Sequence, residues 1–156
     1  MAAMSDFLEN KLIDFIFRGQ ALGITGAAAA AGTGPTNLYY GLLTAAPSDT
    51  GGGTEVTGGS YARVTVASSL ANYAGTQSAG STVASSGNTG TTSNNNAITF
   101  PAPSANWGVV SHFGVYDAST AGNLLFWGAL TVSKTINSGD AAPSFAAAAF
   151  SLQIDN

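Results

Sequence analysis

The first apolar residues of the chain recur every three or four positions, which is the spacing of one face of an α-helix. The spacing predicts an amphipathic helix over residues 5–18, which Ser5 or Asp6 can cap and which Gly19 can end. We expect this helix either to pack on its own domain or to anchor the chain to a partner. The residues expected to bind a partner are Phe7, Leu8, Leu12, Phe15 and Ile16.

Four other residues complete the pattern of this helix. Ile13 and Phe17 are apolar but lie off the main stripe, so the apolar arc is wide. Asp14 and Arg18 are four positions apart, in the order that favours an ion pair on an exposed helix face. The spacing therefore predicts an exposed ion pair beside a broad apolar surface.

The helical pattern is lost after Gly19, and a strand pattern begins at Leu38. Residues 20–36 are rich in Ala and Gly and predict a linker or extended arm. Further on, short segments rich in apolar, aromatic and β-branched residues are separated by Gly, Pro, Asn and Asp, which predicts strands and turns. The predicted strands are 38–44, 61–67, 97–100, 109–117, 123–131 with a continuation through 132–136, and 145–154.

Two segments have a weaker pattern. Residues 68–96 consist mostly of Ser, Thr, Gly and Asn and predict a long polar loop, with at most a weak strand at Leu70–Tyr73. The run Ala146–Ala149 would favour helix locally, but Phe150, Leu152 and Ile154 alternate, so we predict a strand there.

Short strands between such turns are typical of a sandwich. We predict a mainly β fold, an antiparallel, jelly-roll-like β-sandwich with an N-terminal amphipathic α-helix. The predicted division is residues 1–19 for the helix, 20–36 for the arm and 37–156 for the sandwich, which includes the polar loop 68–96.

Composition narrows the class of protein. Only 8% of the 156 residues are charged, against about 25% in an ordinary soluble domain, so we expect much of the surface to be covered in an assembly. The net charge is −4 and the four basic residues are scattered, which argues against nucleic acid as a partner. The longest apolar runs are too short to span a bilayer, so no membrane partner is expected.

The sequence contains no strong catalytic or metal-binding motif. His112 is the only histidine, there is no cysteine, and no G-x-S-x-G sequence occurs, so we expect no enzyme activity, no metal site and no cofactor. Asp49 and Glu55 lie in a Gly-rich segment that predicts a turn rather than a calcium loop. Trp107, in the sequence Asn-Trp-Gly, is the aromatic residue that we expect to contact a ligand or partner.

Two blocks of the sequence resemble a family of small bacteriophage proteins that are usually labelled tail fibre proteins. The first runs from Leu38 through Ala45–Asp49 to Gly59–Val64, and the second comprises Ile98–Pro101, Trp107–Asp117 and Gly122–Leu130. The predicted helix is similar too. The resemblance covers most of the chain except residues 27–34 and 68–96, and it implies a virion protein.

We compare three candidate functions for the chain. The first is a capsid decoration or cement subunit on the exterior of the particle, which packs against the major capsid protein and forms a homo-oligomer. The second is a tail fibre or fibre-adaptor protein, although the chain has no heptads or repeats from which to build a shaft. The third, an enzyme such as a depolymerase, lacks a catalytic set of residues.

Overall fold

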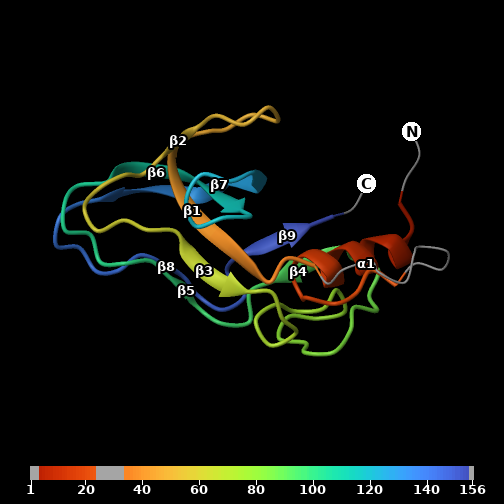
Figure 1. Ribbon diagram of the computed structural model, residues 1–156. Coiled ribbons are helices and arrows are strands. Elements are labelled where there is room, and N and C mark those ends of the chain that lie inside the picture. Colours follow the sequence, from red (N-terminus) through yellow and green to blue (C-terminus); the bar gives the residue numbers. More distant parts are fainter. Residues whose placement is uncertain (1–3, 24–33, 155–156) are drawn as a thin grey trace. The chain divides into compact units, whose positions relative to one another are not determined.

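The computed structural model describes residues 4–23 and 34–154 (Figure 1). Most of the predicted arm, residues 24–33, lies outside this part. The contact pattern divides the chain into two compact units. The helix unit consists of Met1–Asn37, Ala67–Ile98 and Phe145–Asn156, and the sheet unit of Leu38–Val66 and Thr99–Ser144.

The described residues form one helix and nine strands. The fold is therefore mainly antiparallel β with an N-terminal helix, as predicted. The elements are α1 (Asp6–Ile16), β1 (Asn37–Ala45), β2 (Thr54–Glu55), β3 (Val64–Ala67), β4 (Thr91–Ser93), β5 (Ile98–Thr99), β6 (Gly108–Tyr116), β7 (Leu124–Ile136), β8 (Ser144–Phe145) and β9 (Ser151–Gln153).

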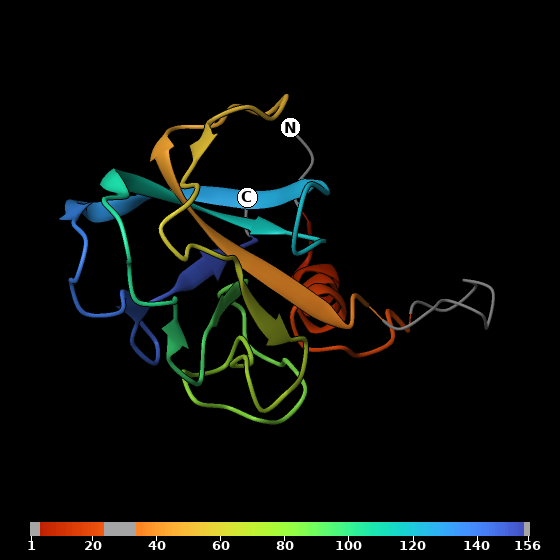
Figure 2. The same ribbon diagram turned by 60° about the vertical axis from the view of Figure 1, so that its left-hand side comes forward.

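The larger sheet has the order β2-β1-β6-β7, and β3 also pairs with β1. The predicted hairpin is confirmed, because β6 and β7 pair antiparallel with Val115 opposite Phe126. The two strands run side by side, with β7 at the edge of the sheet (Figure 2). The predicted continuation of β7 past a bend is also confirmed. Val110 pairs with Lys134 and His112 with Ala129, so β7 bulges between them.

The core of the sheet unit consists of apolar side chains from both long ladders and from the loops beside them. β1 contributes the largest share, since its sequence combines aromatic and aliphatic residues that suit a pleated, buried surface. The buried members are Leu38, Tyr40, Leu42, Leu43, Val56, Phe100, Trp107, Val110, Val115, Tyr116 and Ile136.

The helix unit is built around Ile13 and Phe17, which are fully buried. The Phe17 ring packs edge-on against Tyr73, with 5.4 Å between the ring centroids. The main stripe predicted from the sequence is only half-buried, so the two residues that lay off that stripe form the centre of the packed face. The polar segment (yellow-green in Figure 1) lies beside α1 in this unit.

Three local predictions are wrong. Asp14 and Arg18 do pair, at 2.6 Å, but both side chains are buried because the polar segment closes over them. Leu70–Tyr73 is a turn rather than a strand, since the Tyr73 amide donates to the carbonyl oxygen of Ser69.

The strand predicted over residues 145–154 is interrupted. A turn over residues 147–149, with Ala148 at a φ of 61°, separates β8 from β9. β8 pairs with β5 and β9 with β4, a short strand that the sequence pattern did not reveal. No helix in the described residues is long and apolar enough to cross a membrane.

Candidate functional site

None of the helix residues expected to bind a partner is fully buried in the structure. Leu8, Leu12, Phe15 and Ile16 are half-buried. Phe7 is 57% exposed, and its ring lies 5.8 Å from Nζ of Lys11. α1 thus presents a half-buried apolar strip and one exposed aromatic ring, in addition to the side that packs into the helix unit.

Trp107 belongs to the sheet unit and is only 5% exposed. Its Nε1–H donates to the carbonyl oxygen of Gly59 at 3.0 Å, and its ring packs edge-on against Tyr61. These contacts give the indole a place in the core, and its expected contact with a ligand or partner stays a prediction.

A cluster of charged and phenolic side chains ties the sheet unit together. Arg63 donates two hydrogen bonds to the carboxylate of Glu55, at 2.7 and 2.8 Å, and further bonds to the carbonyl oxygens of Ala118 and Ala121. The guanidinium carbon lies 3.4 Å from the centroid of the Tyr116 ring. Because every nitrogen of Arg63 is engaged, the cluster joins β2, the start of β3 and the β6–β7 hairpin.

Tyr61 completes this cluster. Its hydroxyl donates to Oε1 of Glu55 at 2.8 Å and accepts a bond from the amide of Leu42. Burial raises the pKa of Tyr61, and the charge of Glu55 raises it further, so the phenol stays protonated. Burial by itself would lower the pKa of Arg63, but the hydrogen bonds and charge of Glu55 outweigh it and raise that pKa.

Two facing glycines make room for the cluster. Gly41 of β1 pairs with Gly114 of β6. A Cβ atom at Gly41 would lie 2.9 Å from Oε1 of Glu55, and one at Gly114 would lie 2.7 Å from the Tyr116 ring. A side chain at either position would therefore displace groups of the cluster.

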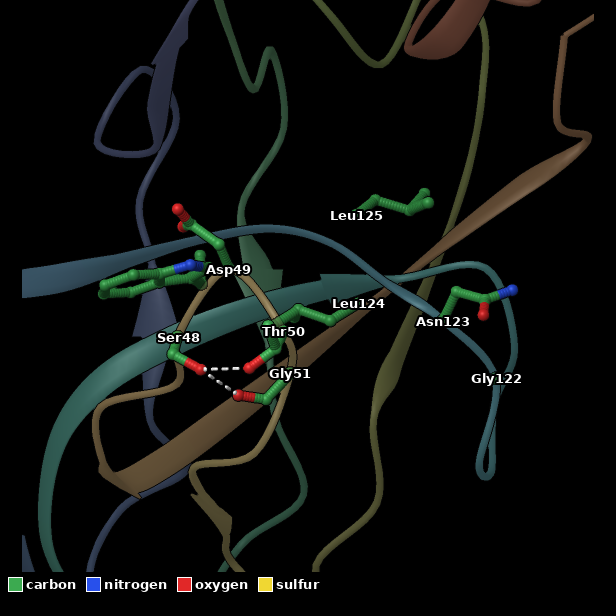
Figure 3. Close-up of a pocket in the computed structure, with 9 residues that line it drawn as sticks. Ser48, Asp49, Thr50, Gly51, Gly122, Asn123, Leu124 and Leu125 are labelled. Atoms are coloured by element: carbon green, nitrogen blue, oxygen red, sulfur yellow. Dashed lines mark hydrogen bonds between the residues drawn. The ribbon is translucent and has the colours of Figure 1, made fainter.

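A recess of about 510 Å³ lies elsewhere on the sheet unit, between a tight turn and the first part of β7 (Figure 3). We call it the turn recess. Its lining combines two large apolar side chains, Leu125 and Trp127, which are 38% and 40% exposed, with several small polar ones. The lining residues are Ser48, Asp49, Thr50, Gly51, Gly122, Asn123, Leu124, Leu125 and Trp127.

Hydrogen bonds fix both walls of the turn recess. On one side, the amides of Ser48 and Gly51 each donate to the other residue's carbonyl oxygen at 2.9 Å, and the Ser48 hydroxyl bonds the hydroxyl of Thr50. The Asp49 carboxylate points away from this hydroxyl pair (Figure 3). On the other side, the Asp117 carboxylate accepts two 2.7 Å bonds from the amide and side chain of Asn123. Both bonds lower the pKa of Asp117, and the bond from the Asn123 side chain has the larger effect.

No motif in the sequence indicates this recess. Asp49 falls in a predicted turn, and Trp127 falls within the predicted strand 123–131. The sequence does contain one indication of the recess. In the segment 124–130 both faces of the strand are apolar, although β7 lies at an edge of the sheet. One of those faces is half-buried, and the other carries Leu125 and Trp127 into the recess.

His112 lies in β6, as predicted, with Nδ1 2.8 Å from the hydroxyl of the adjacent Ser111. Within the described part of the chain, no group of three or more His, Cys, Asp or Glu side chains could hold a metal ion.

A family model described as "Podophage GP4 fiber I protein gp80" matches residues 3–153. The match includes the helix, every strand among the described residues, the whole sheet unit and most of the helix unit. No curated protein sequence matches the chain.

Proposed function

Since the chain belongs to the podophage GP4 fiber I protein gp80 family, we propose that it is a tail fibre or fibre-adaptor protein that takes part in host attachment. The match over nearly the whole chain carries this proposal. Family membership makes the chain a structural protein of a phage virion. The fibre description fits the proposed role on the tail better than the capsid decoration role that the sequence first favoured.

The attachment to the particle is assigned to α1. Its packed side holds Ile13 in the core of the helix unit, while the strip of Leu8, Leu12, Phe15 and Ile16 is only half-covered. Phe7 projects from the same helix with more than half of its surface exposed. A partly exposed apolar strip on a folded unit is a typical protein contact surface.

The remaining parts of the proposal follow from composition. A surface with so few charged groups suits contact with other virion proteins and with further copies of the chain on the exterior of the particle. The function is proposed as non-enzymatic, because the charged cluster of Glu55, Tyr61 and Arg63 is engaged in holding the fold.

The proposal is tested by the number and location of copies on purified particles. We expect mass spectrometry to give at most a few tens of copies per particle, and antibody labelling to mark the tail. We also expect the isolated full chain to slow adsorption of the phage to its host. Hundreds of copies spread over the capsid would instead support decoration.

The role of α1 is tested separately in phage that carry the substitution Phe7→Asp. We expect fewer copies on the particle and an unchanged melting temperature of the isolated protein, because the replaced side chain is exposed. Val83→Asp is the matched control, since Val83 is 63% exposed in the same unit but lies outside the helix. Normal incorporation of the Phe7→Asp protein would contradict the assignment.

A further inference from the structure

We propose that the turn recess binds a neutral or amino-bearing sugar residue of a surface polysaccharide. The proposal builds on the function in host attachment and adds the class of ligand and the residues that contact it. It rests on three features of the recess: a partly exposed apolar platform, polar groups that have no hydrogen-bond partner among the described residues, and the sign of its charge.

The platform consists of Leu125 and Trp127 on β7. Alternate residues of the strand point to the same side, so both side chains project from one face of β7, where the Trp127 ring also packs against the ring of His112, with 6.1 Å between the ring centroids. Large apolar side chains are seldom left uncovered together on a folded unit, and such patches mark binding grooves. An indole ring offers a flat apolar face with a polar edge, which matches a sugar ring that has C–H groups on its face and hydroxyls around it.

The polar groups of the recess are available to a ligand. Among the described residues, neither the Asp49 carboxylate nor Nε1–H of Trp127 has a hydrogen-bond partner. Asn123 uses its side-chain nitrogen on Asp117, which leaves its Oδ1 as an acceptor. The recess therefore presents one donor and several acceptors, as binding of sugar hydroxyls requires.

Two other recesses of the sheet unit lack charged groups that are available to a ligand. Both border the Glu55–Arg63 pair, and the strong polar groups of that pair already bond each other and the carbonyl oxygens of the hairpin. A ligand there would have to displace protein hydrogen bonds. The turn recess would need no such exchange.

Charge selects the kind of sugar. Among the residues that the structure describes, Asp49 is the single charged side chain that lines the turn recess, and the whole chain has a net charge of −4. A uronic acid or a phosphorylated sugar would find no cation there and would be repelled by the carboxylate. An ammonium group would be attracted, and neutral hydroxyls can donate to the carboxylate. The volume of about 510 Å³ lies within the range of small-molecule sites, about 300–1,000 Å³.

Tryptophan fluorescence of the full chain provides the test, because the chain has two tryptophans and Trp107 is buried. The probes are cellotriose, the trimer of glucosamine and the trimer of galacturonic acid. We expect the first two to change the emission and to protect Trp127 from quenching by iodide, and the acidic trimer to do neither.

Substitutions assign the binding to the recess by calorimetry with the glucosamine trimer. Trp127→Ala should weaken binding at least about tenfold, the equivalent of roughly 1.4 kcal/mol, since it removes the platform. Asp49→Asn should reduce the preference for the glucosamine trimer over cellotriose. Val132→Ala, at a residue of β7 that is 77% exposed and outside the recess, should leave binding unchanged.

The proposal would be overturned if none of the probes bound, if Trp127→Ala bound as the unchanged protein does, or if the acidic trimer bound best. A basic peptide that bound in place of the saccharides would have the same consequence. These results are independent of particle location and adsorption. A protein that marks the tail but binds no saccharide would therefore leave the proposed function intact.

Discussion

At the scale of single residues, Arg18 connects several segments of the helix unit. Its side chain is fully buried and pairs with Asp14 at 2.6 Å. It also donates to the carbonyl oxygens of Tyr73, Ser81 and Val83 and to the hydroxyl of Ser85. Asp14 in turn accepts bonds from the amide and the hydroxyl of Ser85. One ion pair at the C-terminal end of the helix thus fixes a polar segment more than fifty residues away in the chain.

Replacing Arg18 is expected to be costly. Arg18→Met should lower the free energy of unfolding by about 3–5 kcal/mol, because a buried carboxylate and several carbonyl oxygens lose their partner. Denaturant unfolding followed by circular dichroism measures the loss. The exposed Lys134 offers a matched control, and Lys134→Met should stay within about 0.5 kcal/mol of the unchanged protein. Equal stability of the two variants would show that the network contributes nothing.

The sequence predicts the ion pair between Asp14 and Arg18 but gives no indication that this pair is buried. Four-residue spacing is enough to predict that Asp14 and Arg18 meet, and they do. Whether they face solvent depends on the segment from Tyr73 to Ser85, whose Ser, Gly and Ala residues carry no apolar pattern to indicate what they cover. The same limit applies to Trp127, whose exposure depends on the turn at Ser48–Gly51 rather than on its own strand.

At the scale of elements, the β4–β9 ladder depends on a close backbone approach. Gly90 precedes β4 with a φ of 55°, and its carbonyl oxygen accepts a bond from the amide of Ile154. A Cβ atom at Gly90 would lie 2.3 Å from the carbonyl oxygen of Ile154. Gly80 also has a positive φ, of 77°, but nothing lies within 4 Å of its Cβ position.

These two glycines separate backbone strain from steric conflict. Gly80→Ala should cost about 1–2 kcal/mol, the penalty of a left-handed conformation for a residue with a side chain. Gly90→Ala should cost roughly 1–3 kcal/mol more, because the backbone of the ladder must also move. Thermal unfolding of the two variants measures the difference. Indistinguishable melting temperatures would mean that the ladder accommodates the methyl group.

Elements with a strong local pattern could be predicted, and elements fixed by distant partners could not. β1, β6 and β7 follow from their apolar and β-branched residues. β4 has only the sequence Thr-Thr-Ser, and its register comes from β9. The turn at Ala147–Ala149 is held by Asn94, which donates to the carbonyl oxygen of Ala146 and accepts from the amide of Phe150. Such bonds between distant residues leave no periodic signal.

At the scale of the whole molecule, the chain passes between its two units several times. The helix unit combines three separate segments, and the sheet unit combines two. Each unit has its own buried side chains, such as Ile13 and Phe17 in one and Tyr40 and Val115 in the other. Segments that share a core and lie far apart in the sequence should lose their structure together.

Hydrogen exchange can test this cooperativity. In the Arg18→Met protein we expect faster exchange in peptides from both 67–98 and 145–154, because the network holds the unit to which both segments belong. Peptides from 38–66 and 99–144 should keep their protection, since their core and the Glu55–Arg63 cluster are unchanged. Val115→Ala should give the reverse pattern, because it opens a cavity in the sheet unit. If protection fell evenly in either variant, the two units would be one cooperative domain.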